Sequence, residues 1–179
     1  MSYFVARALH VAADLGLADL VAEAPTAISA VARAAQCEER ALARLLRVLS
    51  AQGIFDTDDA TVRHTEASRL LRSDHPYSLR AFAQMFGLPV MWRSAEALTH
   101  SIRTGEAAAP VVFPEAGFWG YLADNPEHAR IFDAAMASKT RGQIAGILSS
   151  YDFSGVASVA DIGGGRGLLL SAIVQRHPE

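Results

Sequence analysis

The stretch "VADIGGGRGLLL", residues 159–170, decides the fold class of its part of the chain. Apolar residues up to Asp161 predict a short strand, the glycines predict a tight turn, and "LLLSAIVQRH", residues 168–177, predicts a helix. A strand, a glycine turn and a helix in this order hold the nucleotide in a doubly wound α/β fold. Glycine suits such a turn because a side chain would block close approach of a ligand, and because φ can be positive there.

The spacing of the turn residues differs from a dinucleotide-binding fingerprint. Gly163 and Gly165 fit G-x-G-x-x-G, but the third glycine position falls on Leu168. The spacing is instead D-x-G-x-G-x-G, beginning at Asp161, and a carboxylate two residues before the first glycine suits a ligand without a pyrophosphate. Glycine-rich turns between a strand and a helix also occur without any ligand, so this alternative remains open.

The composition indicates a soluble globular protein that can bury a core. Of the 179 residues, 51% are hydrophobic and 20% are charged. The length fits one domain or one and a half, since domains commonly have about 100–200 residues. The net charge of -3 argues against a protein that coats nucleic acid.

The start of the chain and its cysteine content indicate a cytoplasmic protein. The first apolar run contains an arginine and a histidine and has no cleavage site after it, so we predict no signal peptide. No stretch approaches the ~18 uninterrupted apolar residues of a membrane-spanning helix. Cys37 is the only cysteine, which excludes an internal disulfide and fits a reducing compartment.

Short amphipathic helices are predicted for the first part of the chain. Residues 3–21 have apolar positions at helical spacing, with Gly16 as a stop or hinge, and Thr26 or Ser29 is predicted to cap a second helix. The third helix, in "EERALARLLRVLSAQGIF", has a leucine stripe on one face and an arginine stripe on the other. The stripes are Leu42, Leu45, Leu46 and Leu49, and Arg40, Arg44 and Arg47.

Two short strands around Ile54–Asp56 and Thr61–Thr65, joined by an Asp-rich turn, are predicted to follow. Three short helices and a hairpin are the winged-helix pattern, which in many proteins reads DNA through its third helix. Residues 1–75 hold eight arginines and ten acidic residues, however, where a DNA-binding domain would be basic. The hairpin also carries Asp56, Asp58 and Asp59, which would face phosphates with like charge.

The middle of the chain is predicted to be helical and rich in aromatic residues and methionine. Within residues 78–103 the large apolar residues are Phe82, Met85, Phe86, Met91 and Trp92. Such clusters fill cores more often than they line ligand pockets. A loop with a short aromatic helix around Phe118–Leu122 comes next, and Pro126 suits the first turn of a long helix.

The segment "VADIGGGRGLLLSAIVQRHP" looks like motif I of the S-adenosylmethionine-dependent O-methyltransferases that act on phenolic, polyketide and indole metabolites in plants and bacteria. The resemblance extends through the whole chain in co-linear order. Its other parts are "ALHVAADLGLADL", "RLLRVLSAQGIF", "TEASRLLRSDHPYSLR", "RTGE", "FWGYLADNPEHARIFDAAM" and "YDFSG".

The resemblance implies roles for particular residues. Asp161, Gly163 and Gly165 would contact S-adenosylmethionine, and Gly164 would shape the same cofactor loop with Ile162 and Gly167. Met136 and Phe132 match the family's helix that faces the acceptor and the methyl donor. Phe82, Met85 and Trp92 are further candidates for the acceptor pocket. The winged-helix region would form a homodimer and help to cover the partner's substrate site.

No catalytic residue and no metal site are predicted in this sequence. The general base of such enzymes is commonly a histidine in the C-terminal half, which deprotonates the acceptor hydroxyl. No histidine of the chain matches that position, and their spacing does not suit a metal. They are His10, His64, His75, His100, His128 and His177.

The predicted fold is mostly α, with a winged-helix-like helical dimerisation domain followed by the truncated start of an α/β Rossmann-like methyltransferase domain. The expected boundaries are 1–100 for the dimerisation domain, 101–150 for linking and substrate-facing helices, and 151–179 for the start of the cofactor domain. We expect the chain to be incomplete and inactive alone, because one strand cannot form an open parallel sheet.

Three further hypotheses remain open. They are a winged-helix DNA-binding regulator, a non-catalytic dimerisation subunit, and a family member that has turned to hydroxylation or to decarboxylation.

Overall fold

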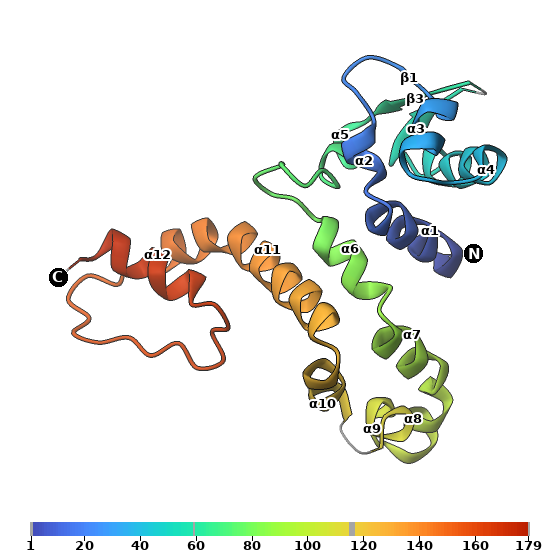
Figure 1. Ribbon diagram of the computed structural model, residues 1–179. Helices are drawn as coiled ribbons and strands as arrows, with labels where there is room; N and C mark the ends of the chain where they lie inside the picture. Colours follow the sequence, from blue (N-terminus) through green and yellow to red (C-terminus); the bar gives the residue numbers. More distant parts are fainter. Residues whose placement is uncertain (1, 59, 115–116, 179) are drawn as a thin grey trace.

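The computed structural model describes residues 2–58, 60–114 and 117–178, and it is mostly helical with one small sheet (Figure 1). Five helices and the sheet gather at the N-terminal end, and the chain then leaves through two further helices, turns, and returns along the longest helix (Figure 1). The elements are α1 (Ser2–Asp14), α2 (Leu17–Leu20), β1 (Thr26–Ala27), α3 (Ile28–Ala34), α4 (Glu39–Ser50), β2 (Phe55–Thr57), β3 (Thr61–His64), α5 (Glu66–Arg69), α6 (Arg80–Phe86), α7 (Pro89–Glu96), α8 (Leu98–Thr104), α9 (Ala108–Val112), α10 (Gly117–Asp124), α11 (Pro126–Ser150) and α12 (Leu168–Arg176).

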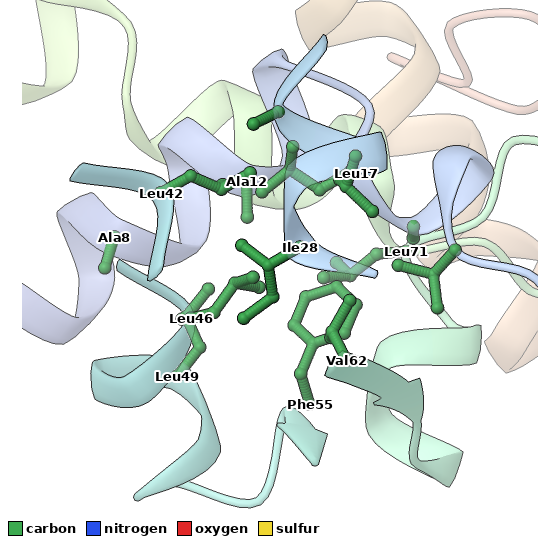
Figure 2. Packing of buried hydrophobic residues seen from close by; sticks show 14 residues of the cluster. Ala8, Ala12, Leu17, Ile28, Leu42, Leu46, Leu49, Phe55, Val62 and Leu71 are labelled. Carbon is green, nitrogen blue, oxygen red and sulfur yellow. The ribbon is translucent and has the colours of Figure 1, made fainter. Parts of the chain in front are cut away.

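The first core lies between α1, α3, α4 and the sheet (Figure 2). Leu46 and Leu49 are fully buried in it, Leu45 is half-buried, and the three arginines of α4 are exposed, as the predicted stripes require. Glu38 caps α4 because its carboxylate accepts the backbone N–H groups of Arg40 and Ala41 at 3.0 and 2.6 Å. The sequence pattern alone therefore orients α4.

The sheet is antiparallel, with strand order β1-β3-β2. The predicted hairpin is confirmed, with Phe55 opposite His64, but the sequence pattern missed β1, which has only two residues. The predicted cap of the second helix is wrong. Thr26 pairs with Val62 as part of β1, so α3 begins only at Ile28 and has no side-chain cap.

The acidic hairpin is partly neutralised by its own cation. Arg63 forms ion pairs with Asp56 and Asp58 at 3.5 and 3.9 Å, and all three side chains are largely exposed. The Asp58 carboxylate also accepts the backbone N–H groups of Ala60 and Thr61, which lowers the pKa of that carboxyl group. Asp59, the third predicted carboxylate, lies outside the described residues.

A second core forms between α6, α7, α10 and α11, around Met85, Val90, Tyr121 and Ala135. Helix α6 belongs to both halves, since it packs on α1 on one side and on α11 on the other (Figure 1). At its end, Gly87 allows close approach to α1, because a Cβ atom there would overlap the ring of His10.

Two predictions about the last third of the chain differ from the structure. The predicted loop after residue 103 contains α9, and the strand predicted up to Asp161 is wrong. Residues 156–160 are irregular and exposed, and no other segment of the described chain pairs with them. A strand requires a hydrogen-bonded neighbour, which apolar composition cannot supply. The helix predicted after the glycines is confirmed as α12.

Among the helices of the described residues, none is both long and apolar enough to cross a bilayer.

Leu46→Ala should remove one of the best-packed side chains of the first core. Leu46 is 0% exposed, so we expect a loss of about 2–5 kcal/mol in the free energy of unfolding from lost burial and the remaining cavity. Urea unfolding followed by circular dichroism measures it. Arg44→Ala, on the exposed face of the same helix, is the matched control and should change stability by less than about 0.5 kcal/mol.

His64 should make the stability of the first core depend on pH. Burial lowers the pKa of His64, and its Nε2–H group donates to the Val21 carbonyl at 3.1 Å. A lowered folded-state pKa means that the unfolded chain binds the proton first. Stability should therefore be full above the ordinary histidine pKa and should fall as the pH drops from that value towards the lowered one. Urea midpoints of the wild type and His64→Gln at several pH values check this, and parallel curves would contradict it.

Candidate functional site

A cavity of about 640 Å³ lies between α10, α11 and the glycine loop that leads into α12. Its volume suits a small molecule, since ligand pockets commonly measure about 300–1,000 Å³. The lining residues are Trp119, Phe132, Asp133, Met136, Ala137, Lys139, Thr140, Gln143, Ile147, Asp161, Gly163, Gly164, Gly165, Arg166, Leu168 and Leu169.

The loop wall of the cavity depends on glycine at alternate positions. Gly163, Gly165 and Gly167 have φ values of 75°, 56° and 68°, a region that side chains rarely adopt. Gly164 has a different reason to be glycine, because a Cβ atom there would overlap the carboxylate of Asp161. The loop is closed by a hydrogen bond of 2.9 Å from the Gly167 N–H group to the Gly164 carbonyl. The carboxylate of Asp161 lies close to Gly164, and Asp161 lines the cavity.

The helical wall is one stripe of α11. Phe132, Met136, Thr140, Gln143 and Ile147 follow one another at intervals of three or four residues, which places them on the same face. The wall is fixed from behind by a hydrogen bond from the Ser138 hydroxyl to the Ser78 carbonyl. Because Ser138 is buried and α6 lies directly after Ser78, this bond ties α11 to the start of α6.

The aromatic wall comes from α10. Trp119 and Phe132 have ring centroids 5.8 Å apart and ring planes at 90°, and Phe118 lies edge-on against both of them. Helix α10 is held on α11 by Tyr121, whose hydroxyl lies 2.7 Å from Nδ1 of His128. Burial raises the pKa of the Tyr121 phenol, so this group stays protonated within the contact.

The structure brings together six of the eight site residues predicted from the sequence. The cavity is lined by Asp161, Gly163, Gly164, Gly165, Phe132 and Met136. Phe82 and Trp92 lie outside its lining, as does Met85. Phe82 packs against the second core with its ring centroid 5.0 Å from that of Phe86, and Trp92 lies under the guanidinium of Arg7, 5.6 Å away.

Sequence reasoning missed four polar lining residues of α11, namely Asp133, Lys139, Thr140 and Gln143. Lys139, Thr140 and Gln143 lie three, four and seven residues after Met136. Helical spacing from Met136 would therefore have identified all three. Trp119 was also missed, because an aromatic residue in a short helix gives no signal for which way it faces.

The described residues contain no group of three His, Cys, Asp or Glu side chains that could hold a metal ion. The lining residues include two carboxylates, one hydroxyl, one amide and two cations, but no histidine and no cysteine. The arrangement can therefore bind a polar ligand on the loop side and an apolar or aromatic ligand on the helix side.

Comparison with known families gives two matches that together span most of the chain. Residues 1–74 match the model described as "O-methyltransferase dimerisation domain", and residues 96–179 match the model described as "O-methyltransferase domain".

Individual relatives agree with these matches. The chain is 38% identical over 175 residues to the mitomycin biosynthesis 6-O-methyltransferase of Streptomyces lavendulae, covering 97% of this chain and 50% of that protein. The crystal structure of LaPhzM superposes with a TM-score of 0.92 at 39% identity, covering 100% of this chain and 54% of that one. An O-methyltransferase of neocarzinostatin biosynthesis, solved with S-adenosylmethionine and 2-hydroxy-5-methyl naphthoic acid, gives a TM-score of 0.75 at 35% identity, covering 97% and 54%. The chain spans about half the length of the curated relatives it matches.

Gly164→Ala should disturb the loop wall, because the new methyl group would force the Asp161 carboxylate away. We expect faster hydrogen exchange at the amides of Gly167 and Ser171, which donate to Gly164 and Gly167 in the closed turn. Gly146→Ala on α11 is the control, since a Cβ atom there meets nothing within 4 Å. Equal exchange in both variants would show that the loop does not need glycine at position 164.

Proposed function

The chain belongs to the S-adenosylmethionine-dependent O-methyltransferases, and on that premise we propose that its cavity is the meeting place of methyl donor and acceptor in a small-molecule O-methyltransferase. The reaction would transfer a methyl group to a hydroxyl of a small aromatic or polyketide-type metabolite. One observation carries the proposal: the glycine loop and the two acceptor-facing candidates, Phe132 and Met136, line the same cavity.

Asp161, Gly163, Gly164 and Gly165 would hold S-adenosylmethionine, which supplies a methyl group bound to a positively charged sulfur. The loop fits such a ligand because Cβ positions at Gly163 and Gly165 point into open space, so the backbone can be approached closely. The Asp161 carboxylate can accept hydrogen bonds from hydroxyl or amino groups of the donor.

Phe132 and Met136 would contact the acceptor from the helix side. An aromatic ring and a thioether offer a polarisable apolar surface that suits a flat aromatic molecule. No histidine lines the described cavity, so we expect this chain to bind the donor without catalysing turnover. The proposal concerns the reaction of the whole protein. Phe82 and Trp92 are not part of the proposed acceptor site, because they lie outside the cavity lining.

We also propose the domain organisation expected from the sequence, with a winged-helix-like homodimerisation unit at 1–100, substrate-facing helices at 101–150 and a Rossmann-like cofactor segment from 151. The helices α3 and α4 with the sheet β1-β3-β2 support the winged-helix part. The second core crosses the boundary at residue 100. Val90, which precedes the boundary, and Leu122, which follows it, belong to the same hydrophobic cluster.

The winged-helix regulator has less support. In the hairpin that would approach DNA, Asp56 and Asp58 already bind Arg63, which leaves this end of the sheet without a free cation among its described residues.

Calorimetric titration of S-adenosylhomocysteine, the demethylated donor, tests the proposal. We expect binding in the micromolar range, and Asp161→Asn should weaken it by about tenfold because a charge-assisted hydrogen bond is lost. Asp124→Asn is the control, since Asp124 is exposed at the end of α10 and outside the cavity lining. The mass in solution, measured alongside, tests the dimer. Absence of binding, or equal binding by the wild type and Asp161→Asn, would contradict the proposal.

A further inference from the structure

The outer wall of the cavity exposes a large aromatic side chain. Trp119 is 70% exposed, although it lies on a helix whose neighbouring residues Tyr121 and Leu122 are buried. An exposed indole that also lines a cavity offers a ready surface for a flat apolar ligand. No residue of the glycine loop supplies such a surface.

The geometry of this wall suits a planar ring. Because the rings of Trp119 and Phe132 are perpendicular, a ligand ring that stacks on Trp119 must meet Phe132 edge-to-face. Stacked and edge-to-face contacts are the two favoured arrangements of aromatic rings. Phe118 braces both residues from the side, and the Tyr121–His128 hydrogen bond fixes α10, so the corner is formed before a ligand arrives.

A positively charged side chain, Lys139, lies further along the face of α11 that lines the cavity. Lys139 is the only lysine of the chain, and it lines the cavity seven residues after Phe132, about 10 Å along α11 at the ordinary helical rise. It forms no ion pair among the described residues. Its ammonium group can therefore take a carboxylate of a bound ligand.

The other charged lining groups are Asp133, Asp161 and Arg166. Asp161 and Arg166 belong to the loop, at the end that the proposed function gives to the donor. Asp133 is next to Phe132 and would repel an acid placed there, so an acidic group is favoured only at the Lys139 end.

We infer that Trp119 and Lys139 are specificity-determining residues that select a planar aromatic acid as the acceptor, with its ring on Trp119 and its carboxylate at Lys139. This inference rests on the proposed function, because it assumes that the donor takes the loop side of the cavity. The donor also has a carboxylate, so the test must separate the two sources of this group.

The test compares two ligands that differ only in charge, 3-hydroxy-2-naphthoic acid and 3-hydroxy-2-naphthamide, by calorimetry on the full chain with and without S-adenosylhomocysteine. We expect the acid to bind more tightly than the amide by about fivefold, and Lys139→Met to abolish that preference. Trp119→Leu should weaken both ligands by about tenfold, whereas Trp119→Phe, which keeps an aromatic face, should retain most of the affinity. Arg141→Met, exposed on α11 and outside the lining, is the control for charge.

Three results would overturn the inference: no binding of either naphthalene ligand to the wild type, unchanged affinities in Trp119→Leu, or a Lys139→Met variant that loses S-adenosylhomocysteine affinity and keeps the acid preference. The last result would assign Lys139 to the carboxylate of the donor. Failure of the proposed function looks different, since S-adenosylhomocysteine would then not bind to the wild type, while the naphthalene ligands would still report on Trp119 and Lys139.

Discussion

The guanidinium of Arg80 holds the two halves of the molecule in place. Its Nε–H group donates to the Ala13 carbonyl at 2.9 Å, and Nη1 pairs with Asp19 at 2.6 Å. The other oxygen of Asp19 accepts the backbone N–H group of Ser73, so one partly buried carboxylate joins three segments. Hydrogen bonds to charged groups contribute about 1.5–3 kcal/mol each to stability. Since Arg80 is the first residue of α6, this network sets where α6 begins and which way it points.

The position of the cavity depends on this network around Arg80. Helix α6 packs on α11, and the hydrogen bond from Ser138 to Ser78 fixes the register between them. The stripe of α11 that contains Phe132 and Met136 is thereby aimed at the glycine loop. On the far side, the Tyr121–His128 contact joins α10, which carries the aromatic wall, to α11, which carries the helical wall. The loop itself needs only local geometry, because its positive φ values and the close approach of Asp161 to Gly164 are decided within seven residues.

This arrangement gives the two sides of the cavity different chemistry. The loop side offers open backbone and a carboxylate, which suits a polar, positively charged donor. The helix side offers rings, a thioether and a lysine, which suits a flat acceptor. Residues 156–160, which lead into the loop, have no strand partner in the described part of the chain. Their exposed apolar side chains, Val156 and Val159, are nevertheless surface that a neighbouring strand could cover.

The sequence by itself determined most of the helices, the hairpin and the glycine turn, because these depend on short-range periodicity, capping and backbone freedom. Leu46 and Leu49 of α4, Pro126 of α11 and the alternate glycines after Asp161 are examples in which neighbours along the chain are sufficient. Tertiary structure decided the rest. It paired Thr26 with Val62, left residues 156–160 without a strand partner, and turned Trp119 into the cavity while Trp92 stacked under Arg7. Each of these outcomes depends on whether residues far apart in the chain contact one another. The pattern of an isolated stretch of sequence carries no information about such contacts.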